Sequence, residues 1–342
     1  MDQPMQTFRR REVLKLGTAG AVAATVAGAV TVRTVRAQDA SKPIKIGHAA
    51  VMTGLLSSLG VSGNQAMKVF VKHVNDGGGL LGRKVELVSR DTQAKPDVAT
   101  QEVRRLVLDD QVDFIVTTDS SGVVLAISPL AAQLKKIMVH GTGASKRFAT
   151  VCNPYAFKAA DSSRLFGYAA AKVMGAKASG VKRWAGINPD YEWGRVVWED
   201  FRAFFPRFLP AGEIVKELWP PFKAADFKPY IAELLEAKVE GVVTSLWSGD
   251  LVNFIKQAKQ FDFFSQTKVF MDMSSTTLDV CLALGNEMVP VWGSGYYYFG
   301  YEKNNMNRAF VRDYVAAFKT VPVSSAGSTY RAALFLKAAI ER

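Results

Sequence analysis

The chain alternates short apolar runs with longer segments in which apolar residues recur at helical spacing. Residues 44–51 form an almost continuous apolar run, as expected for a strand that is buried on both faces. In the segment that follows, Ala66, Phe70 and Val74 fall on one face of a helix, and the glycines at 77–79 predict its end. The pattern therefore begins with a strand and a helix.

Apolar runs of strand length recur along the rest of the chain. We expect strands at 85–88, 114–117, 137–139, 184–187, 214–215, 241–246 and 269–271. Helices are predicted over 96–109, which opens with a proline, and over 123–134, 251–258 and 332–342. Strands that alternate with helices imply parallel sheets with helices on both faces.

Two runs of this alternation meet near residues 157–163. We therefore predict an α/β fold with two doubly wound parallel-sheet lobes joined by a hinge. We assign residues 38–160 and 294–342 to the first lobe and residues 161–293 to the second. The 342 residues, of which 49% are hydrophobic and 22% are charged, suffice for two such cores.

The formal net charge of +12 is partly an N-terminal feature. A basic cluster at 9–15 precedes a segment at 16–32 that is rich in Ala, Gly and Val, an order typical of an export signal peptide. A transmembrane anchor is disfavoured because the segment is short, contains glycine and ends at Arg33. Elsewhere no basic run is interleaved with aromatic residues, which argues against a nucleic-acid partner.

The core of this segment, RRxVLK from Arg10 to Lys15, resembles the twin-arginine signal, with Val13 where that pattern usually has Phe. The resemblance predicts passage of residues 1–37 through the twin-arginine export machinery, with cleavage near Ala37. No cysteine lies near the cleavage site, so we expect no lipid anchor but a soluble periplasmic protein.

The segments after the predicted strands contain mostly hydroxyl-bearing residues, glycines and aromatic residues. They are 52–54, 119–122, 141–145, 188–191, 247–250 and 272–274. In open parallel sheets a ligand binds beyond the carboxyl ends of the strands, which is where these segments begin. Serine hydroxyls and backbone N–H groups at helix N-termini bind a carboxylate without any cation. The aromatic residues are suited to enclosing an apolar remainder.

None of the common catalytic motifs matches these segments. The loop from Gly141 fits neither G-x-x-x-x-G-K-[ST] nor G-x-G-x-x-G, and the chain has no G-x-S-x-G. The three histidines lie at no metal-ligand spacing. We therefore expect no enzyme activity, no cofactor and no metal site. Cys152 and Cys281 are the only cysteines. Export permits a disulfide between them, but two separate buried thiols are favoured.

From residue 44 to its end, the chain resembles the leucine/isoleucine/valine-binding protein family, the type I periplasmic solute-binding proteins of ABC importers. The matching stretches are IKIGHAAVMTG, VNDGGGLLGRKVELVSRDTQAKPDVA, DSSG, HGTGAS and DYEWGR. Family members continue for several elements beyond the helix at 332–342, so the resemblance implies a first lobe that is incomplete at its C-terminal end.

The resemblance also implies a set of ligand-binding residues. The carboxylate is expected at Ser120, Ser121, Gly122, Gly143 and Ser145, and the apolar part of the ligand at Leu59, Tyr191, Trp193 and Trp247. Amino-acid binders of the family place an acid after the strand at 269–271, to pair with the ligand's ammonium group. That position is Ser274 here, with Asp272 two residues earlier. Either Asp272 takes the role or the ligand lacks an α-amine.

The function that the resemblance implies is capture of a small carboxylate, an amino acid or an aromatic or aliphatic acid, by hinge closure. A monomer would then deliver the ligand to an ABC permease and its ATPase in the inner membrane. Two alternatives remain open at this point. One is a sensory binding protein that presents its ligand to a receptor. The other is a periplasmic enzyme on the same fold, which would require a nucleophile–base pair or a metal cluster.

Overall fold

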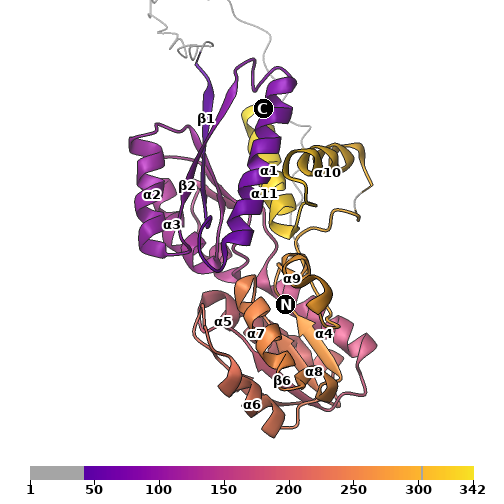
Figure 1. Ribbon diagram of the computed structural model, residues 1–342. Helices are drawn as coiled ribbons and strands as arrows, with labels where there is room; N and C mark the ends of the chain where they lie inside the picture. The colour runs from indigo at the N-terminus through magenta and orange to yellow at the C-terminus, as the bar shows by residue number, and fades with distance from the viewer. Residues whose placement is uncertain (1–41, 302) are drawn as a thin grey trace, which may run out of the picture. The chain divides into compact units, whose positions relative to one another are not determined.

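The computed structural model describes residues 42–301 and 303–342 (Figure 1). The predicted export signal and its cleavage site lie outside the described residues. Within them the chain forms two parallel β-sheets, each covered by helices, which confirms the predicted two-lobed α/β class. No helix among the described residues has the length and apolarity required to span a membrane.

The first sheet contains five parallel strands in the order β2-β1-β3-β4-β5. They are β1 (Ile44–Ala50), β2 (Val85–Asp91), β3 (Phe114–Thr118), β4 (Met138–His140) and β5 (Ala156–Lys158). Successive side chains on a strand point to opposite faces of the sheet. Ile46 and Val116 pack with α1 (Ser57–Asp76), α10 (Asn305–Phe318) and α11 (Ser324–Ile340). Ile115 and Met138 pack with α2 (Pro96–Leu108) and α3 (Ser121–Gln133) on the other face.

The second sheet contains four parallel strands in the order β7-β6-β8-β9. They are β6 (Arg183–Ile187), β7 (Glu213–Leu218), β8 (Gly241–Thr244) and β9 (Val269–Asp272). Trp184 and Val243 pack with α4 (Ser163–Lys177) and α5 (Glu192–Phe208) on one face. Val242 and Phe270 pack on the other face, against α6 (Lys228–Glu236), α7 (Gly249–Lys259), α8 (Phe263–Gln266) and α9 (Thr277–Leu284).

Several elements were not among those predicted from the sequence: the strand β5 and the helices α4, α5, α6, α8, α9 and α10. β5 was not predicted, because it is only three residues long and its outer side chains are polar or exposed. The last helix begins at Ser324 and not at 332. The run from Ser324 to Thr329 carries no apolar periodicity, yet it is buried because its small residues allow a close approach to neighbouring elements. Ser325 Oγ lies 2.5 Å from Ser62 Oγ on α1.

Several hydrogen bonds join residues of the first sheet's loops to residues of the second sheet's loops. Ser58 Oγ lies 2.7 Å from Ser248 Oγ, and Lys223 Nζ donates to the Gln93 carbonyl oxygen at 3.1 Å. Ser248 has φ 51°, an unusual value for a residue other than glycine. These bonds form only when the two lobes are close together.

The two cysteines are not bridged. Cys152 is exposed and Cys281 is half-buried, so the expectation of two buried thiols was wrong. Cys152 follows η1 (Lys146–Thr150) in an irregular surface segment, and Cys281 lies on an outer turn of α9. Cys281 is only partly covered although its neighbours Val280 and Leu284 on α9 belong to the core of the second lobe.

Candidate functional site

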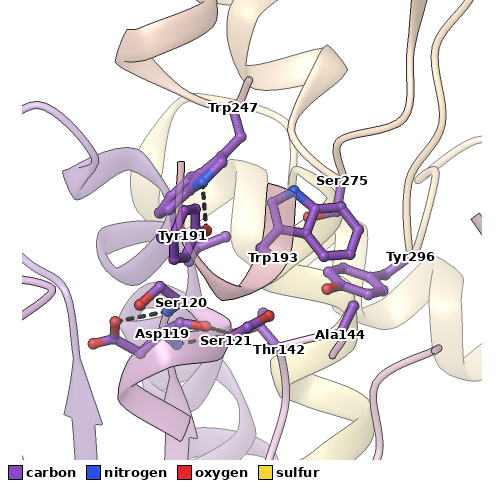
Figure 2. Close-up of a pocket in the computed structure, with 12 residues that line it drawn as sticks. Asp119, Ser120, Ser121, Thr142, Ala144, Tyr191, Trp193, Trp247, Ser275 and Tyr296 are labelled. Atoms are coloured by element: carbon purple, nitrogen blue, oxygen red, sulfur yellow. Dashed lines mark hydrogen bonds between the residues drawn. The ribbon is translucent and has the colours of Figure 1, made fainter. Parts of the chain in front are cut away.

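A small pocket lies where the carboxyl ends of strands from both sheets meet (Figure 2). Its volume is about 30 Å³. The loops that follow strands of the first sheet, with the first turns of α1 and α3, contribute Leu59, Asp119, Ser120, Ser121, Thr142, Gly143 and Ala144. The loops that follow strands of the second sheet, the first turn of α5 and the segment after α9 contribute Tyr191, Trp193, Trp247, Ser275 and Tyr296. Among these twelve described residues there is no Lys, Arg or His.

The N-terminus of α3 forms the polar floor of the pocket. Ser120 caps the helix, and its Oγ accepts a hydrogen bond from the Val123 backbone N–H at 3.4 Å. Ser121 Oγ accepts from the Ser145 backbone N–H at 3.2 Å. A serine hydroxyl that accepts one hydrogen bond keeps its own proton for donation. The floor therefore offers two O–H donors beside the positive end of a helix, an arrangement that suits an anion.

The loop after β4 is held against this floor by a reciprocal pair of bonds. The Thr142 hydroxyl donates to the Asp119 carbonyl oxygen and accepts from the Asp119 backbone N–H, both at 2.8 Å. Gly143 follows with φ +78°, and a Cβ built there would lie 2.6 Å from the Val124 side chain. Only glycine fits this position, because any side chain would clash and the backbone is left-handed.

Asp119 is the one acid in the pocket wall, and it is 1% exposed. Its carboxylate accepts from the Ser120 backbone N–H at 2.7 Å and from the Thr92 hydroxyl. Burial disfavours the charged form and raises the pKa of Asp119 to about 7, although these hydrogen bonds oppose the shift. Asp119 is therefore partly neutral near physiological pH.

Aromatic rings form the opposite wall. The Trp247 Nε1–H donates to the Tyr191 hydroxyl oxygen at 2.8 Å, and the Tyr191 ring stacks on Phe222 with centroids 4.1 Å apart. Burial raises the pKa of Tyr191 well above its usual value, so its hydroxyl remains protonated. Trp193 is fixed by donation from its Nε1–H to the Ser245 carbonyl oxygen at 3.1 Å. These hydrogen bonds and the stacking fix the orientation of the three wall rings.

The structure brings seven of the eleven predicted site residues to the pocket wall. They are Leu59, Ser120, Ser121, Gly143, Tyr191, Trp193 and Trp247. Gly122 lies just behind them, since a Cβ built there would be 3.8 Å from the Tyr191 ring. Ser145 is buried outside the wall, and its hydroxyl donates to Glu192 Oε1 at 2.5 Å.

Asp272 and Ser274 are also buried outside the wall. Asp272 accepts from the Ser274 backbone N–H at 2.6 Å, from the Ser274 hydroxyl at 2.9 Å and from the Thr277 hydroxyl at 2.6 Å. Both side chains therefore stabilise the turn that leads into α9. Burial raises the pKa of Asp272 to about 6, and the three hydrogen bonds oppose that shift.

Five wall residues were not predicted: Asp119, Thr142, Ala144, Ser275 and Tyr296. The first three lie inside the DSSG and HGTGAS segments, in which other residues were predicted from the sequence to bind the ligand. Ser275 is adjacent to Ser274 and is the residue that turns inward. Tyr296 comes from a segment without strand or helix pattern, and its ring packs edge-on against Phe166 with centroids 5.3 Å apart.

The wall offers donors and flat apolar faces but no nucleophile paired with a base. Among residues 42–301 and 303–342, no group of three or more His, Cys, Asp or Glu residues is placed to hold a metal ion. His48 and His140 are fully buried and do not line the pocket. His48 is bonded to Asn64 and Thr118, and His140 is bonded to Thr117 and Ser128.

Comparisons with known proteins agree with this architecture. A family model described as periplasmic binding protein matches residues 43–342. The Leu/Ile/Val-binding protein homolog 4 of Brucella abortus is 28% identical over 226 residues, which cover 64% of this chain and 54% of that protein. The chain therefore spans about half the length of the curated relatives it matches.

Two solved structures illustrate the likeness in fold. One is a solute-binding protein of an ABC transporter from R. palustris in complex with benzoate. Its TM-score is 0.78 at 22% identity, with 87% of this chain and 81% of that chain covered. The other is a leucine-binding protein from Thermotoga maritima, with a TM-score of 0.76 at 21% identity and coverage of 87% and 83%. At these identities the likeness shows the fold alone.

Proposed function

Because the chain belongs to the periplasmic binding protein family, we propose that it is the solute-binding component of an ABC importer. In this proposal it captures a small organic carboxylate between its lobes in the periplasm. It then presents the closed form to a membrane permease that is driven by an ATPase. The similar proteins described above include one solved with benzoate and one described as leucine-binding, and both ligands are small carboxylates.

The observation that carries the proposal is the donor floor at the N-terminus of α3. The Ser120 and Ser121 hydroxyls keep their protons for a ligand oxygen, and no basic side chain lines the described wall. A carboxylate held in this way receives charge-assisted hydrogen bonds from neutral donors. A neutral ligand would gain less from the same donors.

Closure follows from the burial of the pocket wall. Ser121, Trp193 and Trp247 of the wall are buried, so the lobes must separate to admit a carboxylic acid with an apolar body. The floor belongs to the first lobe and most of the aromatic wall to the second. A ligand that touches both stabilises the closed form more than the open form, and this difference drives closure.

Calorimetry with the full chain tests the carboxylate requirement. The probes are acids and their neutral amides, namely benzoate with benzamide and 3-phenylpropanoate with 3-phenylpropanamide. We expect at least one acid to bind about tenfold or more tightly than its amide, because the amide lacks the charge that the floor stabilises. Equal affinity for acid and amide in every pair would contradict carboxylate capture.

A further inference from the structure

Each described acid near the pocket accepts at least one hydrogen bond from another group. Asp119, the acid of the described wall, accepts from Ser120 N–H and from Thr92, and it is almost inaccessible. An ionised Asp119 would repel a carboxylate bound in the pocket, and burial already disfavours that ionised form.

The other nearby acids do not reach the pocket. Glu192, between the wall residues Tyr191 and Trp193, accepts from Ser145 Oγ at 2.5 Å and from Arg147 Nη1 at 2.9 Å. Asp272 takes its three hydrogen bonds from its own turn. At the point where the chain after β9 meets the pocket, the side chain in the wall is Ser275.

Two further buried acids of the second lobe, Asp250 and Asp279, each accept through Oδ2 and keep Oδ1 without a partner among the described residues. Asp250, in the first turn of α7, accepts from the Lys223 backbone N–H at 3.1 Å. Asp279, in α9, accepts from the Ser58 hydroxyl at 3.1 Å. Neither is part of the wall. An ammonium group enclosed in this pocket would therefore contact hydroxyls and aromatic rings, and no ionised carboxylate of the described wall would pair with it.

We propose that the ligand of this pocket is a carboxylate without an α-ammonium group. The inference rests on the proposed function and narrows its substrate class. The donor floor and the hydroxyl of Tyr191 stabilise negative charge, while a positive charge removed from water without a partner is strongly disfavoured. The same wall that accepts an organic acid therefore rejects the amino acid of equal shape.

Matched ligand pairs test the inference on the full wild-type chain. 3-Phenylpropanoate and L-phenylalanine differ only in the α-ammonium group, as do 4-methylpentanoate and L-leucine. We expect the acid without the amine to bind at least about tenfold more tightly in each pair that binds. The affinity of the weaker ligand of a pair is measured by calorimetry in which the tighter ligand displaces it.

Three results decide the question. Preference for the amine-free acid supports the inference. Equal or tighter binding of L-phenylalanine or L-leucine overturns it and leaves carboxylate capture intact. Failure of all four compounds and of benzoate to bind overturns the proposed function, and the inference with it.

A variant adds an independent check. Asp119→Asn keeps the shape of the side chain and removes its charge. For each pair we compare the affinity for the amine-free acid with that for the amino acid. We expect their ratio to differ by less than about twofold between the variant and the parent, because Asp119 does not pair with an ammonium group. A selective tenfold loss of amino-acid binding in this variant would identify Asp119 as that partner and contradict the inference. Asp97→Asn, on the outer surface of α2, is the matched control.

Discussion

The Trp247 indole donates its Nε1 hydrogen to the hydroxyl oxygen of Tyr191 at 2.8 Å. Because that oxygen already accepts a hydrogen bond, the Tyr191 proton is free to point into the pocket. Phe222 stacks on both rings, with centroid distances of 4.1 Å to Tyr191 and 5.9 Å to Trp247. One wall of the pocket is thus a preorganised aromatic stack that presents a single polar hydrogen.

Removal of that hydrogen should weaken ligand binding. We expect Tyr191→Phe to reduce the affinity for the tightest carboxylate by about 1–2 kcal/mol, since the ligand loses a donor and the Trp247 N–H loses its acceptor. Titration calorimetry measures the change. Tyr230→Phe, on α6 and outside the pocket, should have no effect. Equal affinities for Tyr191→Phe and the parent would exclude the Tyr191 hydroxyl from the site.

The floor should be more sensitive than the wall. Ser121→Ala removes the hydroxyl that accepts from Ser145 N–H and donates to the ligand. We expect a loss of about 1–3 kcal/mol in binding, the usual range when a charged acceptor loses one hydrogen bond. The exposed Ser179→Ala is the control. A variant that binds as the parent does would place the carboxylate elsewhere.

Contacts between the lobes should influence the equilibrium between the open and the closed form. Lys223 Nζ donates to the carbonyl oxygens of Gln93 and Ala94 at 3.1 and 3.4 Å. Lys223→Met removes these bonds while keeping the length of the side chain. We expect an affinity several-fold lower, because fewer contacts favour the closed form. Lys228→Met, on the exposed surface of the same lobe, serves as control. Unchanged affinity would show that these bonds do not stabilise closure.

A planar apolar body should fit the aromatic wall better than a puckered one. Flat rings stack against Tyr191 and Trp247 over their whole face, whereas a saturated ring makes contact at a few hydrogens. Benzoate should therefore bind more tightly than cyclohexanecarboxylate, which has the same carbon skeleton. Competition calorimetry with the two acids compares them directly. A preference for the saturated acid would mean that the rings do not select for planarity.

The buried histidines make part of the stability depend on pH. Burial lowers the pKa of His48 from 6.5 to about 4. Below pH 6.5 His48 is therefore protonated in the unfolded chain but stays neutral in the native chain. The native state loses stability as the pH falls toward 4. This loss amounts to about 2 kcal/mol at pH 5.

His48→Gln removes this titration. Urea unfolding should show that the deficit of the variant relative to the parent shrinks by about 2 kcal/mol between pH 7.5 and pH 5. The buried Asp119 and Asp250, whose pKa values burial raises to about 7, act in the opposite direction in both proteins and cancel in the comparison. A deficit that does not change with pH would mean that His48 titrates normally in the folded protein.

Much of the fold was predictable because parallel strands buried on both faces leave continuous apolar runs. β3 and β6 fall within a residue of the predicted runs. The loops at Ser121 and Gly143 were predictable for a related reason, since serine at a helix start and glycine in a tight turn follow local rules. These rules operate within a few residues and need no knowledge of tertiary contacts.

The direction in which individual side chains point was not predictable. Ser145 was predicted to bind the ligand carboxylate, but its hydroxyl donates to Glu192 from the other lobe. Asp272 is turned away from the pocket by hydrogen bonds within its own turn, and Ser275 takes the place in the wall. Tyr296 reaches the pocket from a segment without periodicity. Each outcome depends on a partner that is distant in sequence or on a choice between adjacent residues.

Small-angle scattering of the full chain tests capture between closing lobes most directly. The radius of gyration is measured without ligand, with the tightest-binding acid of the panel at saturation, and with its amide at the same concentration. The account predicts that the acid compacts the protein and that the amide leaves its dimensions unchanged. Tight binding of the acid, established by calorimetry, with no change in the radius of gyration would contradict it.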